Sequence, residues 1–319
     1  MGQCRDGNEV FQAFAWPLSN GVPGNPLQLS PGTSGVMTHA TGVSINGYVI
    51  GTAVAQNGSF TGVFWAPGSG TPTVLPGLSL LGIGIVLGNC EPVDINDATS
   101  PVVAGNCAMG NGQDQPVYWT GLNGLFNVAH ALPKPSGAAY CSASEVNNSG
   151  QILGQCYYSG SADTYLAVIW GAGGAGPTVL TTINGNTALR TTGVDMNDSG
   201  AVIVSFTGGT TNGGIAGSQQ CAIWTSGTNA QSVVIPGATD CVPAGIGNNG
   251  KAMVTLKLSN GNTNAAHVDY TSSLTAVAEG DVAGGSNSAV TAQSRSGANA
   301  GVAAENSAGQ EHAETEAVL

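Results

Sequence analysis

The chain has 319 residues, enough for one large domain or two small ones, and it combines 50 glycines with only 8% charged residues. Six Lys and Arg stand against 18 Asp and Glu, which gives a net charge of −12. So few cations argue against binding to nucleic acid or to an anionic membrane surface, because they could not neutralise its phosphates. The apolar content of 41% indicates short strands joined by turns rather than a disordered chain.

No apolar run is long enough for a transmembrane helix, since the best, residues 75–87, is interrupted by Pro76 and by several glycines. The N-terminus has no basic region followed by an apolar stretch, so no signal peptide is predicted. Seven cysteines nevertheless favour an oxidising compartment. We therefore expect a secreted, extracellular or cell-surface protein of bacterial type, whose chain begins inside a repeat.

An internal repeat of about 50 residues is the strongest signal in the chain. Its first landmark opens a tight turn and is Asn in five copies and Ser in a degenerate sixth: Asn46, Asn96, Asn147, Asn197, Asn248 and Ser294. Its second landmark is an aromatic residue that keeps step with the first: Trp16, Trp65, Trp119, Trp170, Trp224 and Tyr270. Because these aromatic residues share the period of the repeat, we expect them to pack its core.

Each repeat predicts four strands, which in the third complete copy are residues 143–147, 151–156, 166–170 and 177–180. In "VDIND" and "VDMND", Val and Ile or Met share one face and Asp lies on the other, as strand alternation requires. The turns "NDSG" and "NNSG" contain residues that suit short hairpin loops. Four antiparallel strands repeated every 50 residues or so are typical of the blades of a β-propeller.

We predict an all-β, single-domain β-propeller over residues 1–319. The inner strand is found six times, near residues 40–46, 90–96, 141–147, 191–197, 242–248 and 288–294. The prediction is therefore six blades, and a seventh would need an inner strand that the sequence does not reveal. We expect strands from both termini to close the ring, with residues 1–35 completing the last blade and residues 311–319 left as a surplus C-terminal strand or tail.

The pattern resembles the HAF-repeat family of probable extracellular repeat proteins, whose repeats pair an "INxxGxxxG"-like hairpin with a "hAFxW"-like strand. The hairpin motif matches at Ile45-Asn46, at Ile95-Asn96 with Gly105, at Val146-Asn147 with Gly150 and Gly154, and at Met196-Asn197 with Gly200. The second motif matches at Ala13-Phe14-Ala15-Trp16. The resemblance covers about 280 residues and implies a secreted propeller. It supplies no catalytic residues to carry over.

Four cysteines bracket two of the predicted hairpins. Cys141 lies six residues before the turn Asn147 and Cys156 nine residues after it, and Cys90 and Cys107 repeat this arrangement. Since antiparallel pairing brings the two ends of a hairpin together, we expect one disulfide in each. Metal ligation is the alternative, but zinc sites usually have close CxxC spacing, and the sequence has none.

The three other cysteines have different predicted roles. Cys221 begins a third strand and Cys241 begins the next inner strand, so a bridge between them would tie adjacent blades. Cys4 is then left over, although "MGQC" aligns with "LGQC" at Cys156, the end of a second strand. We expect Cys4 to have an upstream partner or to bridge to another molecule.

Three acids lie two residues before their turn Asn in consecutive repeats: Asp94, Glu145 and Asp195. Because few cations are available to pair with them, they are candidates for a Ca²⁺ site near the axis, where carboxylate oxygens would serve as ligands. The favoured alternative is a ring of solvated acids, or acids that accept hydrogen bonds from nearby turns. No other cofactor is predicted.

No catalytic constellation is apparent. Four histidines are scattered, and none has metal-ligand spacing or lies near a Ser in a GxSxG turn: His39, His130, His267 and His312. We therefore expect a non-catalytic structural or adhesive subunit that self-assembles head-to-tail into oligomers or fibres. A lectin-like glycan-binding module is the alternative, and a glycan-active hydrolase is the least favoured of the three.

Overall fold

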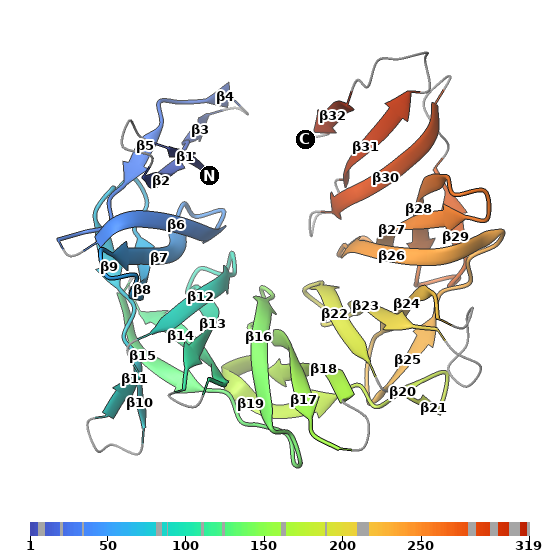
Figure 1. The fold of residues 1–319 in the computed structure, drawn as a ribbon, viewed down its shortest axis with the longest axis horizontal. Coiled ribbons are helices and arrows are strands. Elements are labelled where there is room, and N and C mark those ends of the chain that lie inside the picture. The colour runs from blue at the N-terminus through green and yellow to red at the C-terminus, as the bar shows by residue number, and fades with distance from the viewer. Residues whose placement is uncertain are drawn as a thin grey trace. The chain divides into compact units, whose positions relative to one another are not determined.

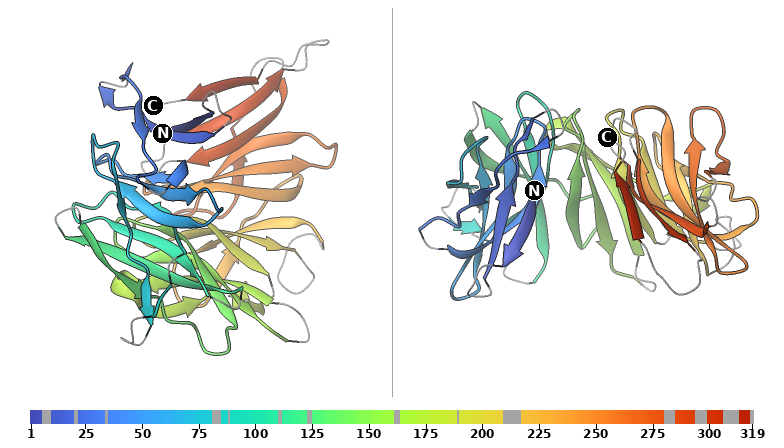
Figure 2. Two further views of the ribbon diagram at one scale, coloured as in Figure 1. Left: turned by 60° about the vertical axis from the view of Figure 1, so that its left-hand side comes forward. Right: turned by 90° about the horizontal axis from the view of Figure 1, so that it is seen from above.

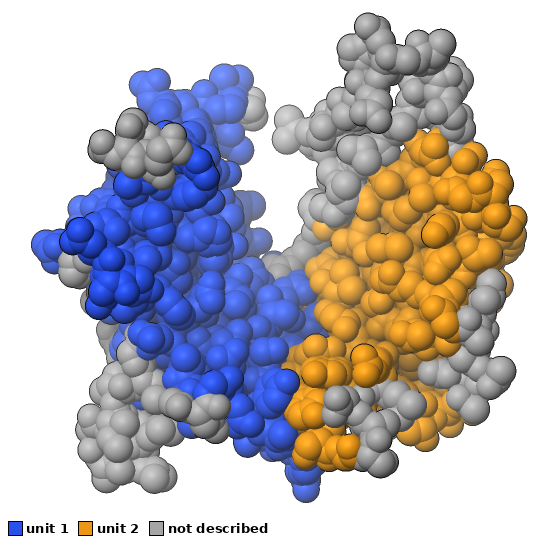
Figure 3. Space-filling view, in the orientation of Figure 1, with its two compact units in different colours: residues 1–154, 170–177 blue, residues 155–169, 178–319 orange. Residues whose placement is uncertain are grey.

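The computed structural model describes residues 1–5, 10–19, 22–33, 35–80, 85–87, 89–109, 112–122, 125–160, 164–188, 190–208, 217–279, 285–293, 299–305 and 313–317. Ser294 and His312 lie outside them. The chain divides into two compact units, which Figure 3 colours separately. Unit 1 contains residues 1–154 and 170–177, and unit 2 contains residues 155–169 and 178–319. Each unit is described by itself, so the predicted single ring stays a prediction.

Unit 1 contains two four-stranded antiparallel sheets whose strands follow one another in chain order (Figure 1). The first consists of β6 (Gly35–Val43), β7 (Val49–Ala55), β8 (Phe60–Trp65) and β9 (Pro72–Val74). The second consists of β12 (Cys90–Ile95), β13 (Val102–Ala108), β14 (Asp114–Leu122) and β15 (Leu125–Ala131). A three-stranded sheet precedes them, made of β1 (Gly2–Arg5), β2 (Phe11–Ala15) and β5 (Leu27–Leu29).

The boundary between the units passes through a further four-stranded sheet. It consists of β16 (Tyr140–Val146), β17 (Ile152–Tyr158), β18 (Thr164–Gly171) and β19 (Ala175–Val179). A 3₁₀ turn, Ala172–Gly174, joins its last two strands, and it is the one helical segment of the described residues. The prediction of an all-β chain is therefore confirmed for the part that the structure describes.

Unit 2 continues the same pattern (Figures 1 and 2). One sheet contains β22 (Thr191–Met196), β23 (Val202–Thr207), β24 (Gln219–Trp224) and β25 (Asn229–Ser232), and the hairpin of β20 (Thr182–Ile183) and β21 (Asn186–Thr187) extends it. The next contains β26 (Ala238–Ile246), β27 (Lys251–Leu258), β28 (Thr263–Asp269) and β29 (Ala276–Ala278). The last is three-stranded, with β30 (Gly285–Gln293), β31 (Asn299–Glu305) and β32 (Ala313–Ala317).

The six predicted inner strands correspond to β6, β12, β16, β22, β26 and β30. Two further hairpins lie outside the repeat pattern, β3 (Leu18–Ser19) with β4 (Val22–Pro23), and β10 (Leu78–Leu80) with β11 (Ile85–Leu87). At the termini, β2 pairs with β1 and β5, whereas β31 pairs with β30 and β32. Part of the tail predicted to be surplus thus pairs with its own chain as β32. The closure of the ring and the number of blades stay predictions.

A bulge in the inner strand explains the glycine of the repeat motif. In the pair β12–β13 the register shifts between Pro92 and Asp94, and Gly105 lies opposite Pro92. A Cβ on Gly105 would collide with the backbone oxygen of Glu91 and lie 2.7 Å from the Trp119 ring. Only glycine therefore lets the bulged strand and the buried ring approach this closely.

We expect Gly105→Ala to destabilise unit 1 by about 1–3 kcal/mol, because the added methyl group overpacks the contact with Trp119 and the bulge. Gly176→Ala is the matched control, since Gly176 also lies in a strand, needs no left-handed conformation and has no atom within 4 Å of a new Cβ. Chemical denaturation of both variants tests the idea. Equal stability of the two would contradict it.

Candidate functional site

The turns at Asn96 and Asn197 are each tied to the next repeat by an amide side chain. Asn96 accepts from the backbone N–H of Val102 in its own hairpin (2.8 Å) and donates to the carbonyl of Asn147 in the next repeat (2.9 Å). Asn197 accepts from Ala201 N–H (2.9 Å) and donates to the carbonyl of Gly247 (3.2 Å). Asn96, Asn147 and Asn197 are all buried. Asn96 and Asn197 are therefore structural, because they satisfy backbone groups of two repeats, whereas Asn147 accepts from the N–H of Gln151 in its own hairpin.

The structure corrects the alignment of the first and fifth turns. In the third repeat, the N–H of Asn147 donates to the carbonyl of Gln151 and closes the turn. In the first repeat the equivalent bond runs from the N–H of Ser44 to the carbonyl of Tyr48, so Ser44, and not Asn46, is the turn position. In the fifth repeat it is made by Gly247, one residue before Asn248. The sequence landmark was displaced because an exposed Asn in the same turn has a different bonding role.

The residue after each turn position forms a second set of bonds between repeats. Asp97 accepts from Ile45 N–H (2.7 Å), Asn148 accepts from Asp97 N–H (2.7 Å), and Asn248 accepts from Asp198 N–H (2.8 Å). Each acceptor lies one repeat after its donor. The short polar side chains of the "ND" and "NN" turns thus join neighbouring sheets as well as shaping hairpins.

Two of the three acids proposed as calcium ligands accept hydrogen bonds from the next inner strand. Asp94 Oδ2 accepts from Val146 N–H (2.8 Å) and Asp195 Oδ2 accepts from Ile246 N–H (2.6 Å). Glu145 is half-buried on β16. Within the described residues, no group of three or more His, Cys, Asp or Glu is placed to hold a metal ion. The calcium site gains no support, and hydrogen bonding explains two of its three acids.

The four indoles that pack the complete repeats are buried, and each donates to a loop carbonyl. Trp65 bonds to Ser30 (3.1 Å), Trp119 to Pro76 (2.8 Å), Trp170 to Pro133 (2.8 Å) and Trp224 to Gly227 (3.0 Å). The predicted packing role of these residues is confirmed, and they offer no exposed ring face to a ligand.

The histidines form no catalytic arrangement in the described part of the chain. His267 Nδ1 lies 2.5 Å from Glu279 Oε1, on the side of β28 next to β29. The ring of His130 stacks on Tyr118, with centroids 4.8 Å apart. His39 lies on β6, in a different repeat from the other two. No Ser or Cys nucleophile is bonded to any of the three.

The three predicted disulfides are present. Cys90 lies directly opposite Cys107 in the β12–β13 register and is bonded to it. Cys221 on β24 is bonded to Cys241 on β26, which ties two adjacent sheets. Cys141 and Cys156 are also disulfide-bonded, and Cys4 is free and exposed, so those two pair with each other. Each bond closes a loop of 15 to 20 residues, worth about 3 kcal/mol by the chain-entropy estimate.

A polar hollow of ≈ 450 Å³ lies in unit 2 and was not predicted from the sequence. Its walls come from β17, β18, β22, β23 and β24 and include Gln155, Tyr165, Arg190, Thr192, Ser205 and Gln219. The Arg190 guanidinium carbon lies 6.0 Å from the centre of the Tyr165 ring. We call this site the Arg190 hollow.

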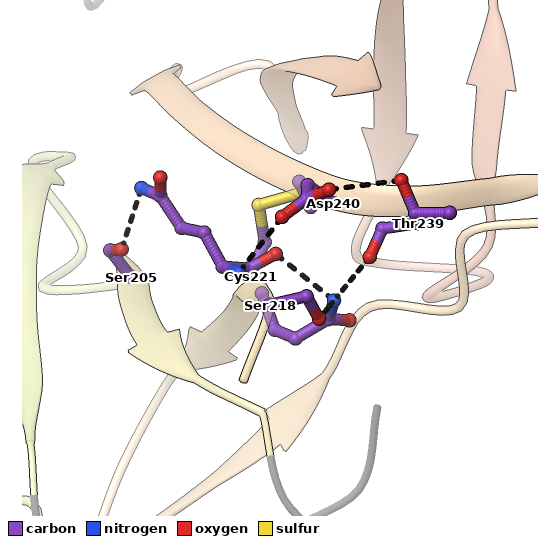
Figure 4. Close-up of a disulfide and its surroundings, with 8 residues drawn as sticks. Ser205, Ser218, Cys221, Thr239 and Asp240 are labelled. Carbon is purple, nitrogen blue, oxygen red and sulfur yellow. Dashed lines mark hydrogen bonds between the residues drawn. A yellow bond between two sulfur atoms is a disulfide. The ribbon is translucent and has the colours of Figure 1, made fainter. Parts of the chain in front are cut away.

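The walls of the Arg190 hollow are held in place by hydrogen bonds. Gln155 Nε2 donates to the Thr191 carbonyl (2.9 Å) and to Thr192 Oγ1 (3.0 Å). On the opposite wall, Gln219 Nε2 donates to Ser205 Oγ (3.0 Å), and Gln219 N–H donates to Asp240 Oδ1 (3.1 Å), beside the disulfide in Figure 4. The covalent tie between β24 and β26 therefore lies two residues from a wall of the hollow.

A second hollow of ≈ 180 Å³ occupies the corresponding place in unit 1. Gln3 and Gln155 each precede an aligned cysteine, and Phe11 and Tyr165 each lie five residues before the Trp of their repeat. Its further lining is Met37, Thr38, His39 and Val54. The recess thus belongs to the repeat, whereas the guanidinium and the larger polar lining distinguish the Arg190 hollow.

The fold is that of β-propeller domains. The chain superposes on the β-propeller domain of the trilobed protease from Pyrococcus furiosus with a TM-score of 0.55 and 11% identity, over 99% of this chain and 93% of that one. The acylaminoacyl peptidase of Pyrococcus horikoshii superposes with a TM-score of 0.52 and 9% identity, over 99% of this chain and 50% of that one. A puromycin-hydrolyzing peptidase of Mycobacterium tuberculosis superposes with a TM-score of 0.53 and 13% identity, over 93% of this chain and 46% of that one. The chain thus spans about half the length of these two peptidases.

No family model matches the sequence, and the search of curated proteins gives no match. The resemblance to the HAF-repeat family therefore stays a prediction. Identities of 9 to 13% show the fold alone. The chain is a β-propeller protein by its structure.

We expect Asn197→Asp to destabilise unit 2 by at least about 2 kcal/mol, because the buried carboxylate cannot donate to Gly247 or to Tyr270 Oη. Asn57→Asp is the matched control. Asn57 accepts from the backbone and hydroxyl of Ser59 just as Asn197 does from Ser199, but in an exposed turn. Urea unfolding measures both, and equal effects would contradict the role assigned to Asn197.

Tyr270→Phe tests the same bond network by pH. Burial raises the pKa of Tyr270 above its usual 10.0, the bond from Asn197 lowers it by less, and the charge of Asp269 raises it. Because the pKa of Tyr270 is higher in the folded state, the unfolded chain ionises at this tyrosine first as the pH rises above 10. The contribution of Tyr270 to the free energy of unfolding is therefore complete below pH 10 and decreases as the pH rises through the folded pKa. We expect Tyr270→Phe to cost about 1–2 kcal/mol at pH 7 and less at pH 11. A difference from wild type that does not change with pH would contradict this.

Proposed function

We propose that the chain is a non-catalytic β-propeller of an extracytoplasmic compartment and acts as a structural or adhesive subunit. Three disulfides fit an oxidising location. Within the described residues, no helix is long and apolar enough to cross a membrane. The buried amides, the indoles and the acids Asp94 and Asp195 hold repeats together, and none of them is arranged for chemistry.

The observation that carries the assembly proposal is the position of Cys4. On the pair β1–β2, Cys4 lies opposite Gln12, and on the pair β13–β14, Cys107 lies opposite Gln115. Gln12 and Gln115 each precede the Trp of their repeat by four residues. Cys4 thus has the same register position as Cys107, which forms a disulfide with Cys90 on an inner strand. Cys4 itself is free and exposed.

The strand β1 pairs with β2 alone among the described strands. An edge strand is a template for strand addition. We propose that an extended segment of a second copy pairs with β1, and that the oxidising compartment joins the Cys4 thiols of two copies in one disulfide, which links those two copies as a dimer. Where the strand contact itself is heterologous, it extends such pairs into oligomers or fibres when its rotation does not close.

The closure of the propeller is part of the same proposal. The sequence predicts six blades, with β2 and β5 joining β30 and β31. The alternative of seven blades is favoured by the pairing of β31 with β32 and of β2 with β1, which gives each terminus a sheet of its own. The propeller domain of the trilobed protease has an open velcro topology. Separate terminal sheets would leave β1 open for assembly.

We expect wild-type protein to form disulfide-linked dimers and Cys4→Ser to remain free of them, because Cys4 is the exposed free thiol of the described residues. The matched control is Gln28→Ser, an exposed residue on β5 at the other edge of the same sheet. Non-reducing electrophoresis, light scattering and negative-stain microscopy measure the outcome. A wild-type protein that stays monomeric with a free Cys4 thiol at high concentration would disprove assembly through this edge.

A lectin-like glycan-binding module is the second candidate function. The observation that favours it is the Arg190 hollow, in which amide and hydroxyl groups surround an aromatic ring. Its volume lies in the range of small-ligand sites. Binding of simple sugars by the monomer would separate this candidate from a purely structural role. A glycan-active hydrolase has no such support, since the described residues that line the hollow include no pair of acids.

A further inference from the structure

We propose that the Arg190 hollow binds a saccharide that carries a carboxylate, such as a uronic acid. The inference deepens the glycan-binding candidate and is independent of assembly through β1. It rests on the charge, the lining and the rigidity of the hollow.

The charge of the hollow is opposite to that of the protein. The chain has a net charge of −12 and six Lys and Arg, one of which, Arg190, lies at this hollow. Among the described residues, the lining contains no Asp or Glu, and no carboxylate forms an ion pair with Arg190. The guanidinium presents a planar fork of donors that matches a carboxylate, and it stays charged at all relevant pH values.

The remaining lining matches a polyhydroxylated ring. Gln155 offers its amide oxygen as an acceptor, because both of its N–H groups donate to Thr191 and Thr192. Gln219 keeps its amide oxygen and one N–H, and the hydroxyls of Thr192 and Ser205, which accept from these amides, can still donate to a ligand. Tyr165 is half-buried and adds an aromatic face next to Arg190. A phosphate group would use the cation but not this set of neutral groups, so the lining favours a sugar acid.

The hollow is preorganised. The isolated bridge between Tyr165 and Arg190 sets their backbones side by side, and the Tyr165 ring contacts the Tyr157 ring with centroids 5.0 Å apart. Gln155 and Gln219 are each oriented by a hydrogen bond within the hollow. Binding therefore requires little ordering of these side chains, which favours affinity.

The test is titration of the full chain with D-galacturonic acid and its di- and trisaccharides, followed by calorimetry or ligand-observed NMR. Neutral D-galactose and its matching oligosaccharides are the second arm, and inorganic phosphate is the third. We expect the acids to bind at least tenfold more tightly than the neutral sugars and than phosphate. Binding should weaken as salt rises, since exposed charges are screened.

Arg190→Gln should lower the affinity for the acids at least tenfold and leave that for neutral sugars unchanged, while Arg190→Lys retains part of it. Arg190 is exposed, so folding should be unaffected, which thermal unfolding checks. Arg5→Gln is the matched control, since Arg5 also lies over an aromatic ring, that of Phe11, on a strand remote in sequence.

The outcomes separate the two ideas. Equal binding of acids and neutral sugars, unaffected by Arg190→Gln, would overturn the carboxylate inference and leave a glycan-binding function standing. Tighter binding of phosphate would overturn it in favour of a phosphate site. Millimolar acids and neutral sugars that both fail to bind would overturn the inference together with the glycan-binding candidate, while the assembly proposal would be unaffected.

Discussion

The bond from a short polar side chain to the backbone of the next repeat is the constraint on which the rest of the structure depends. An inner strand such as β16 pairs with one neighbour in its own sheet, so its other edge has backbone groups without a ladder partner. Asp94 satisfies the N–H of Val146, and Asn106 satisfies both the N–H and the carbonyl of Ala143. Side chains of one sheet therefore replace the missing strand, and buried backbone groups between sheets are paired.

This arrangement also explains why the protein needs so few charged residues. A carboxylate can find a hydrogen-bond donor without a cation, as Asp195 does in the backbone N–H of Ile246. The sequence left two explanations for the acids of the inner strands: a Ca²⁺ site and, as the favoured alternative, acids that are solvated or accept hydrogen bonds from nearby turns. In the structure, the donors to Asp94 and Asp195 are backbone N–H groups on the inner strand of the next repeat, which the sequence pattern could not specify.

Features that follow from hairpin and strand geometry were largely predictable, and a site assembled from several strands was not. The disulfide between Cys90 and Cys107 followed from hairpin geometry, since antiparallel pairing about the turn brings the two ends of the hairpin opposite each other. The turn positions at Ser44 and Gly247 were misplaced because a neighbouring Asn masked them. The Arg190 hollow was missed because its walls come from five strands, and its one sequence signal was a rare cation in an acidic chain.

The contrast between the two hollows indicates where function separates from scaffold. Both occupy the same place in the repeat, yet the unit 1 hollow has Met37 where the Arg190 hollow has its guanidinium, seven residues before the structural turn position in each case. Fold alone thus accounts for the recess but not for its cation. The Cys221–Cys241 bond fixes the strand that carries Gln219 in the same region. The disulfide limits local motion beside Arg190, a charge that does not recur in the unit 1 hollow. We expect this combination where one repeat is specialised for binding.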